Sequence, residues 1–206
     1  MPTSTSTLLI LGAGGHGRVV ADAALAQGRW AGVRITDRDA ARVGETPLPG
    51  IQVEAIADAL ASCSEVHVAI GSPASREREA GAAGLPLATV LHPHASVSPF
   101  AEIGAGCFVA ARAVVAPGAR LGVCVIVNHG AVVDHDVQVG DFSHIAPLVA
   151  LGGNVRVGAR VLVGAGASVL PGVRIGDDIV VGAGAVVREH LDAPGVYAGV
   201  PARRMR

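Results

Sequence analysis

The stretch Leu121–Gly158 reads LGVCVIVNHGAVVDHDVQVGDFSHIAPLVALGGNVRVG and repeats every six residues. An aliphatic residue occupies every sixth position from Leu91 to Val187, seventeen consecutive positions without a slip. At every third hexad a glycine follows it, as in Val139-Gly140. A period of six fits neither a strand nor an α-helix, and it is typical of a parallel β-helix in which three hexads complete one triangular coil.

This repeat predicts the architecture of the second half of the chain. The aliphatic side chains point inward, and small residues or glycine let the chain turn each corner. Residues eighteen apart then stack about 4.8 Å apart, one strand spacing. Coils of hexapeptide repeats are usually left-handed, against the normal crossover rule. We therefore expect an all-β, left-handed parallel β-helix domain with a C-terminal tail over residues 89–206.

The first half of the chain alternates strand and helix patterns. Strands are expected at 7–12, 33–37 and 65–70, and a helix over 18–27 with Val19, Ala23 and Ala26 on one face. A second helix is expected around 76–83, with Ser72 as its N-cap and Pro73 in its first turn. This alternation predicts a small α/β domain, half the size of a full Rossmann fold, over residues 1–88.

Composition excludes several classes of function. The chain has 206 residues, five of them aromatic, and a formal net charge of −1, which disfavours binding to nucleic acid or to a membrane surface. All 16 cationic side chains are arginines, so lysine chemistry is excluded. The three cysteines are scattered without a CxxC pair, as in reduced cytosolic proteins, and no apolar run reaches 18 residues. We expect a cytoplasmic protein.

A glycine-rich motif follows the first expected strand. Residues 12–17 read GAGGHG, which fits G-x-G-x-x-G, and the backbone N–H groups of such a turn can hold a diphosphate. Asp37, at the end of the next strand, is placed to bind a ribose hydroxyl, so the motif alone favours NAD. The half-sized domain and the β-helix that follows favour a nucleotide sugar instead, with His16 in reach of the sugar or its phosphates. The alternative is that these glycines serve the turn alone.

The sequence Asp134-His135-Asp136 is the strongest candidate for catalysis. A histidine titrates near pH 7, and a carboxylate on its other ring nitrogen fixes the tautomer and stabilises the imidazolium. The plain alternative is a solvated turn. A zinc site of His129, His135 and His144 is disfavoured because spacings of six and nine put them on different faces. Cys124 is disfavoured as a nucleophile because nothing local would lower its pKa.

Stacking arithmetic also points to an oligomer. His135 and Gly153 are eighteen apart and share one edge of the coil, whereas Ala165 and Ala183 share another edge. A pocket that uses both edges is built most easily between two neighbouring coils.

The chain resembles a known family in LILGAGGHGRVVAD (9–22), VNHGAVVDHDVQVGDFSHIAP (127–147), GGNVRVG (152–158) and AGVPARRM (198–205). These motifs are similar to those of sugar acetyltransferases that join a nucleotide-sugar-binding α/β domain to a left-handed β-helix. The family includes the bacillosamine-type amino-sugar N-acetyltransferases and their sialic-acid O-acetyltransferase relatives. The resemblance covers almost the whole chain. It implies a homotrimer with acetyl-CoA in the groove between two coils, no metal and no acyl-enzyme.

The resemblance also implies roles for individual residues. His135 matches the general base, and Asp136 the acid that raises its basicity. The expected coenzyme contacts are His144, Gly153, Ala165 and Ala183. The expected nucleotide-sugar contacts are Gly14, Gly15, His16, Asp37, Arg38, Gly71 and Asn128. We therefore expect acetyl-CoA-dependent N-acetylation of a nucleotide-linked amino sugar. The alternatives are O-acetylation of a sialic-acid-type sugar and a non-catalytic trimeric nucleotide-binding scaffold.

Overall fold

The computed structural model describes residues 6–205, which fall into two compact units. The first unit extends to Pro93 and the second begins at His94. This division lies shortly after residue 88, because residues 86–88 pair with a strand of the first unit: the Val66 N–H donates to Pro86 O, and the Ala88 N–H donates to Val66 O. No helix within residues 6–205 has both the length and the apolar character needed to cross a bilayer.

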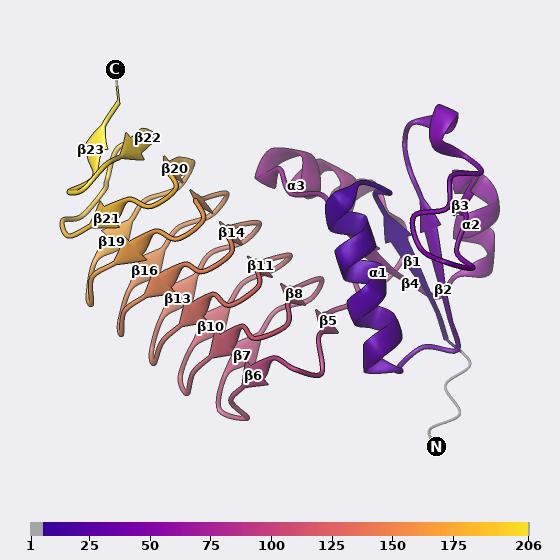
Figure 1. Ribbon diagram of the computed structural model, residues 1–206, viewed down its shortest axis with the longest axis horizontal. Helices are drawn as coiled ribbons and strands as arrows, with labels where there is room; N and C mark the ends of the chain where they lie inside the picture. The colour runs from indigo at the N-terminus through magenta and orange to yellow at the C-terminus, as the bar shows by residue number, and fades with distance from the viewer. Residues whose placement is uncertain (1–5, 206) are drawn as a thin grey trace. The chain divides into compact units, whose positions relative to one another are not determined.

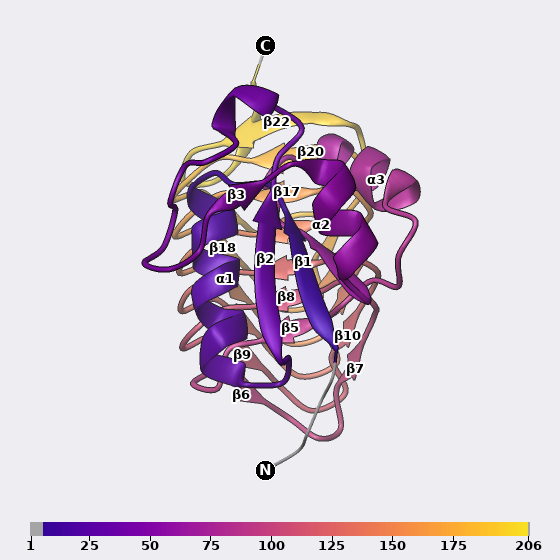
Figure 2. The same ribbon diagram turned by 90° about the vertical axis from the view of Figure 1, so that its right-hand side faces the viewer.

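The first unit is a four-stranded parallel sheet with the order β3-β2-β1-β4. Helix α1 packs on one face of the sheet and α2 on the other (Figure 1), and Figure 2 shows β1 and β2 side by side between them. The elements are β1 (Thr7–Leu11), α1 (Gly15–Gln27), β2 (Gly32–Thr36), the 3-10 helix η1 (Ala40–Arg42), β3 (Val53–Glu54), α2 (Ile56–Ser62), β4 (Glu65–Val68) and α3 (Pro73–Ala82).

The predicted α/β domain is confirmed, with additions and one correction. Sequence patterns missed β3, α2 and η1, which are short. The Ser72 side chain caps α3 by accepting from the Ser75 N–H, and Pro73 lies in the first turn, as predicted. The apolar face predicted for α1 differs from the face that is buried: Val20 and Ala24 are buried with Ala23, whereas Ala26 is exposed. A Cβ at residue 17 would overlap the Gly12 carbonyl oxygen, so α1 can start this close to the preceding loop only because residue 17 is glycine.

The second unit is a left-handed parallel β-helix of three sheets, as predicted (Figure 1). We name its faces after one outward-pointing residue each. The Arg156 face holds β7 (Glu102–Ile103), β10 (Arg120–Leu121), β13 (Gln138–Val139), β16 (Arg156–Val157) and β19 (Arg174–Ile175). The Val132 face holds β6 (Ser96–Val97), β9 (Val114–Val115), β12 (Val132–Val133), β15 (Ala150–Leu151), β18 (Ser168–Val169) and β21 (Val186–Val187). The His144 face holds β8 (Phe108–Val109), β11 (Ile126–Val127), β14 (His144–Ile145), β17 (Leu162–Val163), β20 (Ile179–Val181), β22 (Gly195–Ala198) and the antiparallel β23 (Arg203–Arg204). The short strand β5 (Val90–Leu91) comes before the coil.

The hexad positions fill the interior of the coil. From Val109 to Val187 every sixth residue is at most 4% exposed. A second inward position, two residues earlier in each hexad, is also buried from Cys107 to Ala185. It carries alanine, valine or isoleucine, as at Ala131 and Val137, except at Cys107 and Ser143. Two inward side chains per hexad therefore fill the prism, and the sequence analysis identified only one of these two positions.

Each corner of the coil contains a residue in the left-handed backbone region. These residues recur every six positions from Gly106 to Gly184, and eight of them are not glycine, among them Asp136 and Leu148. The glycine that follows every third hexad serves another purpose. A Cβ at Gly140 would stand 2.6 Å from the Gly158 carbonyl carbon in the next coil, so this glycine permits close stacking rather than the turn.

Candidate active site

His135 and Asp136 form a hydrogen-bonded pair at a corner of the coil. This corner, between the Val132 face and the Arg156 face, is called here the His135 corner. Nδ1 of His135 lies 2.9 Å from Oδ2 of Asp136, and the His135 N–H donates to Oδ1 of Asp134 at 2.7 Å. The hydrogen bond to Asp136 and the charge of Asp134 raise the pKa of His135. With Nδ1–H donating to a carboxylate, Nε2 carries the lone pair and can accept a proton.

Glycines on both sides of this pair make room for it. One coil away in one direction, a Cβ at Gly118 would overlap the Asp136 carboxylate. One coil away in the other direction, a Cβ at Gly153 would overlap the His135 ring, 2.5 Å from Cε1. Both side chains of the pair are more than half exposed. The stacking of His135 with Gly153 agrees with the eighteen-residue arithmetic, and Gly118 is a supporting residue that the sequence analysis did not single out.

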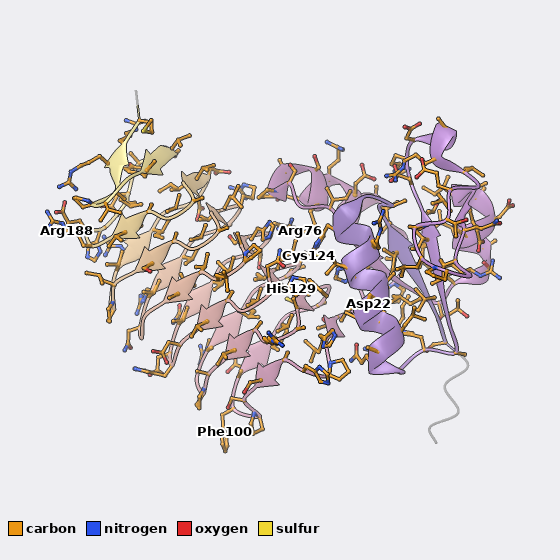
Figure 3. The ribbon with its side chains drawn as sticks, in the orientation of Figure 1. Asp22, Arg76, Phe100, Cys124, His129 and Arg188 are labelled. Atoms are coloured by element: carbon orange, nitrogen blue, oxygen red, sulfur yellow. The ribbon has the colours of Figure 1, made fainter. Side chains whose placement is uncertain are left out.

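A second group of expected residues lies around the corner between the His144 face and the Val132 face, called here the His129 corner. This corner carries His129, Pro147, Ala165 and Ala183 in register, one per coil. An apolar hollow of about 420 Å³ opens there beside Arg112 and the exposed Leu148. Figure 3 shows His129 and Cys124 on turns of the coil.

Asn128 connects two histidines near the His129 corner. Its Nδ2 lies 3.2 Å from Nε2 of His144, and its Oδ1 accepts from the His129 N–H at 2.8 Å. The strand register explains the first contact, because Ile126 pairs with His144 and Asn128 follows two residues later. Asn128 therefore orients the His144 imidazole, a contact that the coil arithmetic could have revealed.

The structure does not bring His135 and His144 together within one chain. His144 lies on the face opposite the His135 corner, because that corner joins the other two faces of the triangle. Ala165 and Ala183 also lie on a different corner from His135. A site that uses both histidines needs two chains.

The small-domain residues singled out in the sequence surround one cavity of about 450 Å³. Gly14, Gly15, His16, Asp37, Arg38 and Gly71 all line it, at the carboxyl ends of β1, β2 and β4. Since β1 lies between β2 and β4, this is the point where the strand order reverses, which is where open α/β sheets bind ligands.

The glycines of the loop before α1 divide into two kinds. A Cβ at Gly12 would stand 2.9 Å from the Ala69 carbonyl oxygen, and one at Gly17 would overlap the Gly12 backbone, so both are required by packing. A Cβ at Gly15 meets nothing within 4 Å, and one at Gly14 meets only an Arg42 nitrogen at 3.9 Å. The space at Gly14 and Gly15 is thus open to a ligand at the start of α1, where no side chain caps the helix.

Asp37 holds this loop in place. Its Oδ2 accepts from the Ala13 N–H at 2.7 Å and from Arg42 at 3.3 Å, and its Oδ1 accepts from the Asp39 N–H. Burial acts to raise the pKa of Asp37, but these amides and the Arg42 guanidinium outweigh it and lower the pKa. The carboxylate is therefore ionised, and in the structure it holds the glycine loop in position at the edge of the cavity.

The placement of the cysteines and of the metal-ligating side chain types can also be described. Among residues 6–205 no group of three histidine, cysteine or acidic side chains is arranged to hold a metal ion. The three cysteines all lie in this range and form no disulfide, and Cys107 and Cys124 are buried. Cys124 sits at a left-handed corner of the coil with 1% exposure, which leaves it out of reach of a substrate.

Comparison with known proteins identifies the family. The PglD N-terminal domain matches residues 7–81, and the bacterial transferase hexapeptide family (six repeats) matches residues 154–189. The acetyltransferase domain of PglB from Neisseria gonorrhoeae is 36% identical, with a TM-score of 0.90 over 98% of this chain and 100% of that one. The chain belongs to the PglB/PerB family of sugar N-acetyltransferases.

Solved structures of this family contain ligands. The PglB domain has been solved in complex with acetyl coenzyme A, again at 36% identity over 98% of this chain and 100% of that one, with a TM-score of 0.90. PerB from Caulobacter crescentus, in complex with CoA and GDP-perosamine, is 38% identical, with a TM-score of 0.88 over 97% of each chain. Membership in the PglB/PerB family makes the protein an acyltransferase.

Sequence reasoning missed several polar residues around the small-domain cavity of this family member. Arg42, Arg78 and Glu79 line it, and the buried Arg76 donates to the carbonyls of Ile70 and Gly71 at its edge. They come from η1 and α3, outside the glycine motif, and only the fold brings them to it.

Proposed function

We propose that this protein transfers the acetyl group of acetyl-CoA to the amino group of a nucleotide-linked amino sugar, with His135 as general base. The observation that carries this proposal is the His135–Asp136 pair, whose Nε2 faces the space left by Gly153. The relatives support the choice of substrates, since PglB is solved with acetyl-CoA and PerB with CoA and GDP-perosamine.

The proposed reaction is a direct transfer without an acyl-enzyme. The sugar nitrogen attacks the thioester carbonyl, forming the N–C bond of a tetrahedral intermediate. The nitrogen gives its proton to Nε2 of His135, and Asp136 stabilises the resulting imidazolium through Nδ1–H. The C–S bond then breaks, the amide forms, and the CoA thiolate leaves and takes up a proton.

We assign the coenzyme to the groove between two copies of the coil, with the His129 corner of one copy on one wall. Ala165 and Ala183 have side chains small enough to let an extended ligand lie against the backbone. His144, oriented by Asn128, would contact the acetyl end of the coenzyme. Gly153, on the His135 corner, would line the opposite wall.

The faces of the coil support a homotrimer. The outward residues of the Arg156 face are polar: Glu102, Arg120, Gln138, Arg156 and Arg174. Those of the Val132 face are uncharged (Ser96, Val114, Val132, Ala150, Ser168 and Val186), and most of those of the His144 face are aliphatic or aromatic. On the His144 face, Phe108 and Ile126 are already buried within the chain, whereas Leu162, Val180 and Val196 are at least partly exposed. The uncharged Val132 face and this exposed part of the His144 face fit burial between copies, while the polar face fits contact with water. In such an assembly the His135 of one copy meets the His144 of the next.

We assign the nucleotide part of the substrate to the small-domain cavity. The open start of α1 at Gly14 and Gly15 suits a diphosphate, and Arg38 supplies a cation at the rim. The first unit thus serves substrate binding and the second unit acetyl transfer.

A panel of acceptors tests this function, with CoA-thiol release as the readout. We expect turnover with GDP- or UDP-linked amino sugars, and its loss in His135→Ala. Turnover with sialic acids alone would instead support the O-acetyltransferase alternative. No turnover with any acceptor would favour the non-catalytic scaffold.

A further inference from the structure

A buried carboxylate on α3 holds two arginines at the small-domain cavity. Glu79 is 6% exposed. Its Oε2 accepts from Nε of Arg38 at 2.7 Å, and its Oε1 accepts from Nε and Nη2 of Arg78 at 3.3 and 3.2 Å. Arg38 follows β2 and Arg78 belongs to α3, so Glu79 joins two separate segments of the chain.

Both arginines keep donors for a ligand. A guanidinium carries five N–H groups in a planar fork, and the contact of Arg38 with Glu79 uses only the one on Nε. The side chains of Arg38 and Arg78 are 51% and 69% exposed, and both line the cavity. Their remaining N–H groups are therefore within reach of a molecule bound there.

The electrostatics of the cavity favour an anion. Hydrogen bonding to Arg38 lowers the pKa of Glu79, so this carboxylate is ionised and the cluster carries two positive charges against one negative charge. Across the cavity, α1 begins at Gly15 without a side-chain cap. Asp37, the other acid that lines it, is matched by Arg42 and two amides.

We propose that Arg38 and Arg78 clamp a phosphate of the nucleotide sugar, and that Glu79 is the positioning residue that fixes both guanidiniums. This inference rests on the proposed function and assigns roles to Arg78 and Glu79 within it. Two long, exposed side chains would otherwise lose much rotamer freedom on binding, and Glu79 lowers that cost by holding them in place beforehand. Planar guanidiniums suit this task because they bind phosphate oxygens in pairs.

The test uses the full-length protein and titration calorimetry with GDP, UDP and dTDP as probes. For any diphosphate that the unmodified protein binds, Arg78→Gln and Glu79→Gln should each weaken binding about tenfold or more, as the loss of a charge-assisted hydrogen bond predicts. The corresponding monophosphate should be affected less. Glu54→Gln is the matched control, because Glu54 pairs with Arg34 at 2.7 Å in the same unit but away from the cavity.

Kinetics separate positioning from folding. Glu79→Gln should raise KM for the nucleotide sugar about tenfold, leave KM for acetyl-CoA unchanged and largely preserve kcat, and Glu79→Asp should restore part of the loss. If Glu79→Gln fails to fold, Arg78→Gln, at a mostly exposed side chain, carries the test. Binding of a diphosphate with equal affinity by the unmodified protein and both variants would overturn the clamp. Binding of none of the three diphosphates by the unmodified protein would instead overturn the proposed nucleotide site itself.

Discussion

Gly153 lies one coil away from His135 and leaves open the ring edge that carries Nε2. A Cβ at Gly153 would stand 2.5 Å from Cε1 and 3.1 Å from Cδ2 of the imidazole, far inside van der Waals contact. The other ring nitrogen, Nδ1, is engaged by Asp136 at 2.9 Å. The one nitrogen that can take a proton is therefore accessible because residue 153 has no side chain.

Gly153→Ala should disable catalysis while the coil stays folded. The added methyl group forces the imidazole to turn away from Asp136 and covers Nε2, and a displacement of about 1 Å can cost on the order of 100-fold in rate. We expect kcat to fall by about that factor, measured at saturating concentrations of both substrates. Thermal unfolding should change little beside this loss, and a Gly153→Ala enzyme with normal kcat would disprove the account of the open ring edge.

The second prediction concerns the His135–Asp136 pair. His135→Ala should lower kcat by roughly 10²–10⁴, the usual loss for a general base, with substrate affinities within a few-fold. Asp136→Asn removes the hydrogen bond that contributes most to raising the pKa of His135. The base must be unprotonated to act, so a lowered pKa moves the acidic limb of the kcat/KM profile to lower pH, and kcat falls less than in His135→Ala.

Asp134→Asn is the matched control for that profile. Asp134 accepts from the backbone N–H of His135 and acts on the ring through charge alone, so its replacement should shift the limb less than Asp136→Asn does. Equal shifts would mean that general charge at this corner, rather than the hydrogen bond, sets the pKa.

The third prediction follows from the opposite placement of His135 and His144 in one chain. His135→Ala and His144→Ala should each be inactive alone. Mixed trimers refolded from equal amounts of both should regain about one quarter of the unmodified activity, because a site shared between neighbours draws each histidine from a different copy. Activity of the mixture no higher than that of the separate variants, with subunit exchange verified by mass spectrometry, would show that His135 and His144 of different copies do not form a shared site.

The fourth prediction compares two glycines before α1. Gly15→Leu points into open space, so it should leave folding intact and raise KM for the nucleotide sugar while KM for acetyl-CoA stays unchanged. Gly17→Ala would overlap the Gly12 carbonyl and should instead lower the free energy of unfolding. Urea titration and steady-state kinetics on both variants separate these effects. Loss of both affinities in Gly15→Leu would mean that this glycine, too, serves the fold.

The six-residue repeat was sufficient to predict the β-helix and the stacking of its coils. The hexad pattern fixes which residues face inward, and adding eighteen to a residue number gives its neighbour in the next coil, as with His135 and Gly153. The second inward column is harder to recognise because it mixes alanine, valine and isoleucine with Cys107 and Ser143, whereas the first column is aliphatic throughout. The left-handed corners were expected at glycine or small residues, yet Leu148 and Arg160 adopt the same conformation.

The polar contacts of the small domain could not be predicted in the same way. Arg38 and Glu79 are 41 residues apart. They meet because β2 ends and α3 begins at the same edge of a sheet whose strand order no local pattern specifies. The place of Asp37 after a strand predicts a ligand contact, but it does not reveal the hydrogen bond from the Ala13 N–H, which depends on the three-dimensional path of the loop.

The last prediction concerns stability and rests on His67, which is 1% exposed in β4 and bonded through Nδ1 to Ala88 O. Burial, aided by the nearby Arg76, lowers its pKa to about 4. In the unfolded chain His67 becomes protonated near pH 6.5, whereas in the folded chain it stays neutral down to about pH 4. The free energy of unfolding therefore falls as the pH is lowered through this window. The loss from this group amounts to about 3 kcal/mol.

Trp30, the only tryptophan, is buried in the same unit and reports its unfolding in urea. His67→Gln, which keeps a donor for Ala88, should reduce the fall in unfolding free energy between pH 6.5 and 4 by about that amount. The exposed His190→Gln, in the other unit, controls for the loss of a histidine. An unchanged slope in His67→Gln would show that His67 is not the group that makes the first unit sensitive to acid.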